Sequence, residues 1–202
     1  HPHRGFETVT IVREGLIDHS DSLGAAARFG GGDVQWLTAG RGIVHAEMFP
    51  LLQRDRPNRL ELFQIWLNLP ASHKMVAPHF KMFWSEQVPH HPFQDAAGAR
   101  TVVTSIAGRV RGATGPEAPT PPPDSWASQD QADVAIWTLS MEPGARWTLP
   151  AASGKGTRRC LYFFEGQSLA VGHQLVDRHA GLELACDVDV ELVNGAQAAQ
   201  LL

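Results

Sequence analysis

Two short stretches of this sequence pair a histidine with another side chain that can bind a metal, two residues away. Residues 1–3 read HPH, which places His1 and His3 around one proline, and residues 45–47 read HAE, which pairs His45 with Glu47. Side chains two residues apart in a β-strand point to the same face. Each pair therefore presents both polar groups to one side. Glu7 has the same parity as His1 and His3 and is a second carboxylate candidate.

Three imidazoles and one carboxylate that converge from two strands inside a barrel suit a divalent transition metal. Imidazole nitrogens bind Fe, Zn, Cu and Ni, and a carboxylate shifts the preference toward Fe(II) or Mn. Strand parity does not distinguish Glu47 from Glu7, so the residues alone leave open which of them supplies the carboxylate.

The elements that must position these residues are expected to be β-strands. Short alternating or apolar segments are separated by glycine turns, at Gly15 and again at Gly40 and Gly42, and no amphipathic helix longer than two turns is evident. Many short strands at this spacing predict an all-β sandwich or barrel, or two of them. The segments expected to contain strands are 7–19, 32–40, 42–49, 59–70, 78–84 (a short edge strand), 133–141, 145–149, 158–166, 168–172 and 182–202.

Composition excludes several classes of protein. The net charge of −4 and the absence of a basic stripe argue against direct nucleic-acid binding. The mean hydropathy of −0.18 and the short apolar runs predict no membrane span. Cys160 and Cys186 suggest no disulfide framework, so a cytoplasmic location is expected.

The motifs also resemble those of a known family. HPHRGFETVTIVREG and GDVQWLTAGRGIVHAEM resemble the two metal-binding motifs of the pirin family, in the cupin superfamily, and the resemblance continues through QIWLNLPASHKMVAPHF and SMEPGARWTLP. It implies a bicupin, two jelly-roll β-barrels in tandem, with one metal in the N-terminal barrel. The implied ligands are His1, His3, His45 and Glu47, which leaves Glu7 as a residue that could orient a ligand. Fe(II) is the implied metal, with Mn, Ni, Cu and Zn as alternatives.

The same resemblance divides the chain into an N-terminal metal-binding barrel at 1–85, a connecting segment at 86–98 and a metal-free barrel at 99–202. A proline-rich stretch at 112–125 is expected to be exposed and irregular. Pirins carry strands before the first motif and continue beyond the last residues seen here. The resemblance therefore implies an internal piece of a longer protein, with His1 on a frayed end.

The second barrel is expected to lack metal ligands. Aligning Gly166 with Gly15 places Ala152 and Gly154 at the positions of His1 and His3, and it places Arg158 at that of Glu7. The remaining histidines are given other roles. His173 and His179 are expected in exposed turns, whereas His90 and His91 are expected in the connection between barrels. Of the tryptophans on strands, Trp36 is expected to pack the barrel and Trp66 is left unassigned.

Two functions follow from the resemblance. The first is a quercetin 2,3-dioxygenase-type reaction on a small aromatic substrate, in which Glu47 or Glu7 takes the substrate proton. The second is a non-catalytic, iron-dependent regulator that binds a protein partner. A shared fold does not choose between these functions.

Overall fold

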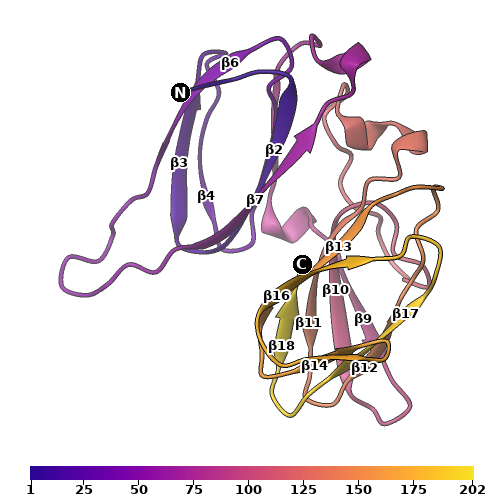
Figure 1. Cartoon of the computed structure of the whole chain (residues 1–202). Helices are drawn as coiled ribbons and strands as arrows, with labels where there is room; N and C mark the ends of the chain where they lie inside the picture. The colour runs from indigo at the N-terminus through magenta and orange to yellow at the C-terminus, as the bar shows by residue number, and fades with distance from the viewer. The chain divides into compact units, whose positions relative to one another are not determined.

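The protein is built almost entirely from β-strands (Figure 1). The computed structural model describes the backbone of residues 1–202 and every side chain except that of Asp130. Over these residues the strands are joined by turns and by short 3₁₀ segments, with no α-helix. The all-β prediction is therefore confirmed. In the described part of the chain no helix is long and apolar enough to cross a membrane.

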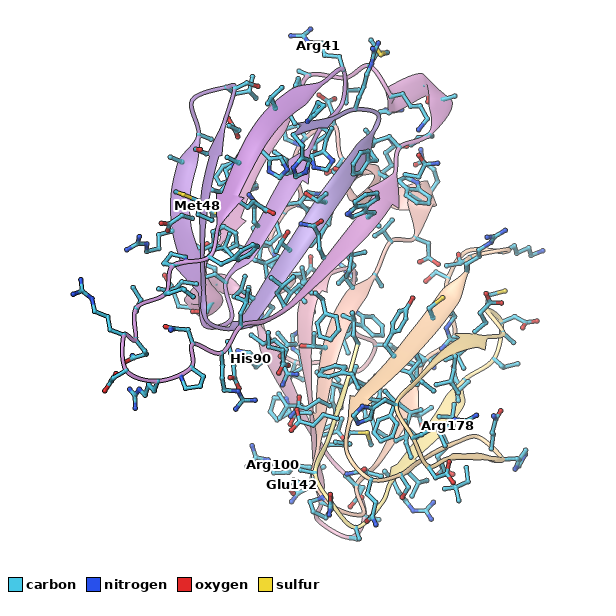
Figure 2. All side chains as sticks on the ribbon, turned by 60° about the vertical axis from the view of Figure 1, so that its left-hand side comes forward. Arg41, Met48, His90, Arg100, Glu142 and Arg178 are labelled. Atoms are coloured by element: carbon cyan, nitrogen blue, oxygen red, sulfur yellow. The ribbon has the colours of Figure 1, made fainter. Side chains whose placement is uncertain are left out.

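The chain divides into two compact units. The N-terminal unit comprises residues 1–88 together with 119–129, and the C-terminal unit comprises residues 89–118 and 130–202. Residues 119–129, named the strap here, thus return from the second unit to the first. Within each unit, side chains fill the space between the sheets (Figure 2). The two units are described separately below.

The N-terminal unit consists of two four-stranded antiparallel sheets. One sheet has the order β1-β6-β3-β4, and the other has the order β7-β2-β5-β8. The predicted turn at Gly15 joins β2 to β3, and β8 is the predicted edge strand. The strands are β1 (Pro2–His3), β2 (Phe6–Glu14), β3 (Leu16–Asp21), β4 (Ala26–Gly30), β5 (Val34–Thr38), β6 (Ile43–Met48), β7 (Glu61–Asn68) and β8 (His79–Phe83).

Strand β2 is buried on both of its faces. Its even-numbered residues face the first sheet, because Val12 packs with Ile17 of β3 and Phe29 of β4. Its odd-numbered residues face the opposite side, where Glu7 and Val9 are fully buried as well. A run rich in threonine, valine and isoleucine suits this position, because β-branched side chains favour the pleated backbone.

A glycine turn fixes the start of β6, which carries two of the candidate ligands. Gly40 has a φ of +48°, and a Cβ atom there would lie 2.2 Å from the carbonyl oxygen of Val76. Only glycine tolerates both the left-handed backbone and this close approach. The carbonyl of Gly40 also accepts a hydrogen bond from the amide of Gly5, at 2.8 Å, where the chain passes from β1 to β2.

The C-terminal unit contains a six-stranded and a four-stranded antiparallel sheet around one hydrophobic core that includes Trp147, Phe163 and Leu192. The sheet orders are β16-β13-β18-β11-β10-β9 and β12-β17-β14-β15. The strands are β9 (His90–Gln94), β10 (Arg100–Ala107), β11 (Ile136–Met141), β12 (Arg146–Leu149), β13 (Arg159–Glu165), β14 (Leu169–Val171), β15 (Gln174–Val176), β16 (Ala180–Leu184), β17 (Val190–Asn194) and β18 (Ala199–Leu201).

The expected placement of His90 and His91 in a connection was wrong, because both lie in β9 at the edge of the six-stranded sheet. His91 is buried and its Nε2 lies 3.0 Å from the hydroxyl of Ser105, whereas His90 is exposed. Proline is tolerated on an edge strand, so Pro92 does not prevent pairing. His173 and His179 are exposed, as predicted.

The proline-rich stretch is irregular, as predicted, but the expectation that it is exposed was wrong at its end. Pro122 is buried and Ser125 has no exposed surface. A 3₁₀ turn, η3 (Trp126–Ser128), follows at once, and the Ser125 hydroxyl caps it by accepting the amide of Ala127. This end of the stretch belongs to the strap.

Candidate metal centre

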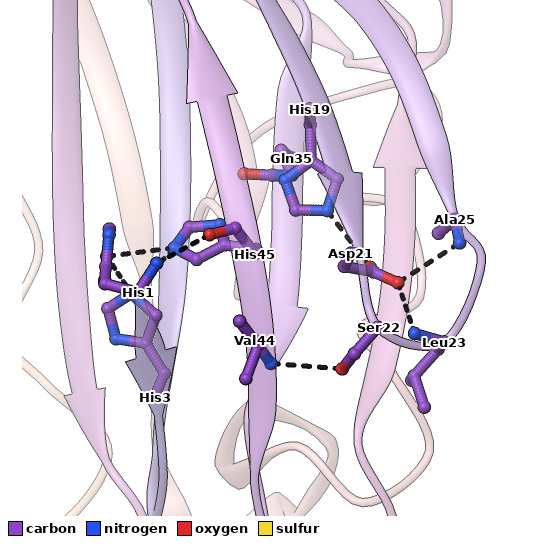
Figure 3. A network of polar contacts seen from close by, with 10 residues as sticks. All are labelled: His1, His3, His19, Asp21, Ser22, Leu23, Ala25, Gln35, Val44 and His45. Carbon is purple, nitrogen blue, oxygen red and sulfur yellow. Dashed lines mark hydrogen bonds and ion pairs between the residues drawn. The ribbon is translucent and has the colours of Figure 1, made fainter.

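Three histidine rings from β6 and the start of the chain converge on one point. The Nε2 atoms of His1, His3 and His45 lie 2.7, 2.8 and 3.1 Å apart. Each pair of ring centroids is 4.6 Å apart, with interplanar angles of 62–72°. The rings thus form a three-bladed arrangement with the three Nε2 atoms turned toward one another (Figure 3). All three residues were predicted to be ligands.

Backbone pairing between β1 and β6 sets up this convergence. His3 pairs with Ile43, and Pro2 pairs with Val44. One step further along, the His1 amino nitrogen donates to the His45 carbonyl at 2.9 Å, and the His45 amide donates to the His1 carbonyl at 3.0 Å. The expectation of a frayed His1 was therefore wrong, because the strand ladder holds its backbone directly opposite His45.

The spacing of the nitrogens fits a metal ion better than it fits hydrogen bonds. An imidazole Nε2 carries either one proton or one lone pair, and both point along the same direction out of the ring. Three such atoms aimed at one point cannot all be satisfied by one another. Three nitrogens at right angles around an ion about 2.1 Å away would lie about 3.0 Å apart, close to the observed spacing.

Burial keeps two of these rings in the form that binds metals. His3 and His45 are buried, whereas His1 is exposed. Burial, followed by the positive charges of His3 and His19, lowers the pKa of His45 to about 4. Burial and the positive amino terminus also lower the pKa of His3. Both rings are therefore neutral near pH 7 and offer a lone pair to a metal.

Glu47 lies on the same face of β6 as His45, as its spacing predicted. Its Oε1 is buried and has no hydrogen-bond partner among the described residues. Burial raises the pKa of Glu47 above its ordinary value. A buried carboxylate oxygen without a donor is costly unless a cation or a proton compensates it, so this side chain is suited to complete a metal site.

In the described geometry, Glu47 lies closer to His19 than the sequence analysis foresaw. Ligand atoms of Glu47, His45 and His19 all lie within 4.8 Å of one another, separately from the cluster of His1, His3 and His45. The antiparallel register explains this, because Glu47 of β6 pairs with His19 of β3 and His45 pairs with Asp21. His45 thus belongs to both groups, whereas Glu47 belongs only to the group with His19.

That second group is a buried network around His19, which sequence reasoning missed. His19 Nε2 lies 3.0 Å from Asp21 Oδ2, and its Nδ1 lies 2.7 Å from Gln35 Nε2 (Figure 3). The ring also stacks on Phe80, with centroids 4.8 Å apart. Because both nitrogens are engaged, His19 is fixed beside the three-histidine cluster and has no lone pair left for a metal. The DHSD stretch has the same two-residue spacing as HPH and HAE, which could have revealed the pair.

Glu7 lies outside this centre. The chain turns at Gly5 between β1 and β2, which belong to different sheets, so the parity shared with His1 and His3 does not carry across. The Glu7 carboxylate instead accepts hydrogen bonds from four donors of the N-terminal unit. They are Trp36 Nε1 at 3.1 Å, Thr38 Oγ1 at 2.7 Å, Ser125 Oγ at 3.0 Å and the Trp126 amide at 2.9 Å.

Two aromatic rings lie next to the histidine cluster. Phe6 and Trp66 lie 4.9 and 6.1 Å from the ring of His3, both close to perpendicular to it. Trp66 is 63% exposed, in contrast to Trp36, which is fully buried as predicted. The site therefore combines converging nitrogens, a carboxylate without a partner and an accessible aromatic surface.

Comparison with known proteins gives a consistent result. The family model described as Pirin matches residues 1–67. A Pseudomonas aeruginosa protein named "putative quercetin 2,3-dioxygenase" is 35% identical over 96% of this chain and 65% of its own length. A pirin-like protein of Caulobacter vibrioides is 33% identical over 100% of this chain and 66% of its own length. The chain thus spans just under two thirds of these relatives.

Solved structures agree with the sequence matches. A quercetin 2,3-dioxygenase from Acinetobacter baumannii superimposes with a TM-score of 0.77 at 27% identity, covering 100% of this chain and 64% of that one. A protein of Geobacillus kaustophilus superimposes with a TM-score of 0.72 at 28% identity, covering 100% of this chain and 74% of that one.

Proposed function

This chain belongs to the pirin family and has its bicupin fold, and on that premise we propose that it is an Fe(II)-dependent dioxygenase that acts on a flavonol such as quercetin. His1, His3 and His45 hold the metal, and Glu47 completes the site. Iron is proposed over Mn, Ni, Cu and Zn because three imidazoles with one carboxylate form a mixed nitrogen and oxygen donor set. We also propose a cytoplasmic location, consistent with free cysteines at positions 160 and 186.

One observation carries this proposal. Three Nε2 atoms lie within 3.1 Å of one another, in a geometry that no arrangement of protons satisfies. Without a cation, such a site leaves buried ring nitrogens without a favourable partner, which destabilises the folded protein. The unpartnered Oε1 of Glu47 on the same strand face adds a negative group where a divalent ion requires one.

The proposed reaction opens the central ring of the flavonol. Both atoms of O₂ enter the ester and carboxylate of the product, and the carbon that carried the 3-hydroxyl leaves as CO. When bound, the metal supplies Lewis acidity for the 3-oxygen of the flavonol and a site for O₂ chemistry. The protein residues must then orient the flavonol and remove the proton of its 3-hydroxyl.

Glu47 is the residue proposed to take that proton. It can do so while its carboxylate is released from the metal, because burial raises the pKa of the metal-free carboxyl group and so favours its protonation. Glu7 was the alternative, but its oxygens already accept hydrogen bonds from four donors. We therefore propose that Glu47 is the base and that Glu7 has a structural role.

Oxygen consumption tests the proposal directly. Protein loaded anaerobically with Fe(II) should consume O₂ in proportion to added quercetin and release CO in equal amount. Fe(II)-loaded E47Q should bind quercetin but consume O₂ at least tenfold more slowly. Absence of quercetin-dependent O₂ uptake in the iron-loaded wild-type protein would contradict the proposed activity.

A regulatory role through a protein partner is the second candidate, and one surface feature favours it. The end of β6 and the segment after it expose large apolar side chains, and Met48, the last residue of β6, points outward (Figure 2). Met48, Phe49, Leu51 and Leu52 are 50–75% exposed. Contiguous exposed apolar side chains commonly mark interaction sites.

Substitutions at Leu51 and Leu52 distinguish the partner-binding role from the dioxygenase role. A partner-binding role requires that L51S/L52S weaken capture of that partner, with unchanged metal content. The dioxygenase role requires instead that the double variant keep the wild-type rate of quercetin-dependent O₂ uptake. The same preparation can be assayed for both.

A further inference from the structure

We propose that Trp66 is the residue that selects planar aromatic substrates at this metal centre, by stacking on the ring that carries the metal-binding oxygens. This inference rests on the proposed function and adds the part of the site that recognises the substrate. It concerns binding, so it can be tested without turnover.

The exposure of Trp66 is the first observation. It is 63% exposed, the most of the six tryptophans, although it lies within β7 and not in a loop. A large indole on a strand is rarely exposed unless it contacts a ligand or a partner. Because Trp66 lies next to His3, a proposed metal ligand, we expect it to contact a molecule bound at the metal.

The indole is also held in place. Trp66 Nε1 donates a hydrogen bond to Gln64 Oε1 at 3.0 Å, two residues earlier on the same strand face. Phe6 packs against the indole, with centroids 4.8 Å apart and an interplanar angle of 34°. An exposed ring that is fixed in advance loses little conformational entropy when a ligand stacks on it.

The register places this ring on the side of the sheet that faces the metal site. Trp66 of β7 pairs with Thr8 of β2, and paired residues share one face. Thr8 is an even-numbered residue of β2, on the face that packs against the first sheet, which carries the histidines. The indole accordingly lies 6.1 Å from the ring of His3.

These positions define the ligand by its chemistry. It needs an oxygen donor, or two adjacent ones, for the metal held by the histidines. It also needs a flat π-system that extends from those oxygens over the indole. Flavonols, with a hydroxyl and a carbonyl on adjacent carbons of a planar ring system, meet both requirements. A small aliphatic chelator meets only the first.

The experiment compares two probes on protein that is loaded with Ni(II) and kept free of O₂, so that no turnover can occur. Quercetin represents the planar chelator, and acetohydroxamate represents a bidentate oxygen chelator without an aromatic ring. Loss of a stacking aromatic side chain typically weakens binding by about fivefold to a hundredfold. We expect W66A to weaken quercetin binding about tenfold and to change acetohydroxamate binding less than twofold. W66F should recover most of the quercetin affinity.

A matched control uses the other exposed tryptophan of the same unit. Trp84 is 37% exposed and follows β8, and W84A should leave quercetin affinity unchanged. Equal quercetin affinity in W66A and wild-type protein would overturn the proposal, as would failure of the wild-type protein to bind quercetin. A W66A variant that changes only its oligomeric mass would show that the indole contacts a second copy instead.

The outcomes separate this inference from the dioxygenase proposal. If wild-type protein binds quercetin through Trp66 but consumes no O₂ with iron, the stacking inference stands and the reaction is wrong. If O₂ uptake is normal in W66A at every quercetin concentration, the reaction stands and the stacking inference is wrong.

Discussion

Glu7 and Ser125 are joined by a hydrogen bond of 3.0 Å between side chains that are both completely buried, across 118 residues of sequence. The same carboxylate accepts the amide of Trp126. The bond fastens the strap, residues 119–129, to β2 of the N-terminal unit. The residue that had been a candidate base is thus an anchor for a returning segment.

The first prediction concerns this anchor. E7A removes the acceptor of four hydrogen bonds and leaves buried donors on Trp36 and Thr38 unpaired. We expect the free energy of unfolding to fall by at least about 3 kcal/mol, measured by urea denaturation. E7Q keeps an acceptor oxygen, so its free energy of unfolding should fall by less. This variant also tests the prediction if E7A does not fold. E86A, at an exposed glutamate of the same unit, is the control. Equal stability of E7A and E86A would contradict the assignment.

A second prediction separates the two carboxylates. E47A should weaken Fe(II) binding at least tenfold, because it removes a buried carboxylate oxygen near His45 that has no hydrogen-bond partner among the described residues. Chelator competition measures this affinity. E7Q should bind Fe(II) as tightly as the wild-type protein once folded. If E7Q instead weakened Fe(II) binding and E47A did not, Glu7 and not Glu47 would be the carboxylate ligand.

The His19 network supplies the third prediction. Because both nitrogens of His19 are engaged by Asp21 and Gln35, the group of His19, His45 and Glu47 does not hold a second ion. We expect one metal ion per chain in wild-type protein and in H19A. H19A should lower the free energy of unfolding by about 1–3 kcal/mol, because it leaves two buried polar groups unpaired. A stoichiometry of two that falls to one in H19A would show a second site.

The fourth prediction is a pH dependence in the C-terminal unit. Backbone hydrogen bonds from Arg146 first, and then from Ala99 and Ala97, hold the pKa of Asp95 below its ordinary value of 3.8. Its contribution to stability is therefore present above pH 3.8 and is lost as the pH falls through the lower, folded-state pKa. D95N should flatten the decline of Tm between pH 4 and pH 2.5. An unchanged slope would show that Asp95 does not contribute.

Much of the fold could be predicted because its signals are local. Short alternating strands and turns at Gly15 and Gly40 are visible within about ten residues, and every predicted segment contains a strand. Strands β4 and β10 were not predicted. Strand β9 was missed because HHPF contains a proline. An edge position, which only the complete sheet reveals, is what permits Pro92 there.

The three-histidine cluster could be predicted from the sequence for the same reason, but the residues around it could not. His1 and His3 stand two residues apart, as do His45 and Glu47, and this spacing can be read directly from the sequence. The parity rule failed for Glu7, because it holds only within one strand and the chain changes sheets at Gly5. Pairing between Glu7 and Ser125 depends on a segment 118 residues away, and no local pattern encodes such a contact.

Metal content of single histidine variants tests the central claim most directly. H45A removes the buried ring shared by both polar groups, whereas H91A removes a buried histidine of the C-terminal unit and is the matched control. After Fe(II) loading and desalting, elemental analysis should find about one iron per chain in wild-type protein and H91A, and less than a tenth of that in H45A. Undiminished iron in a folded H45A protein would contradict the claim that His1, His3 and His45 form the metal site.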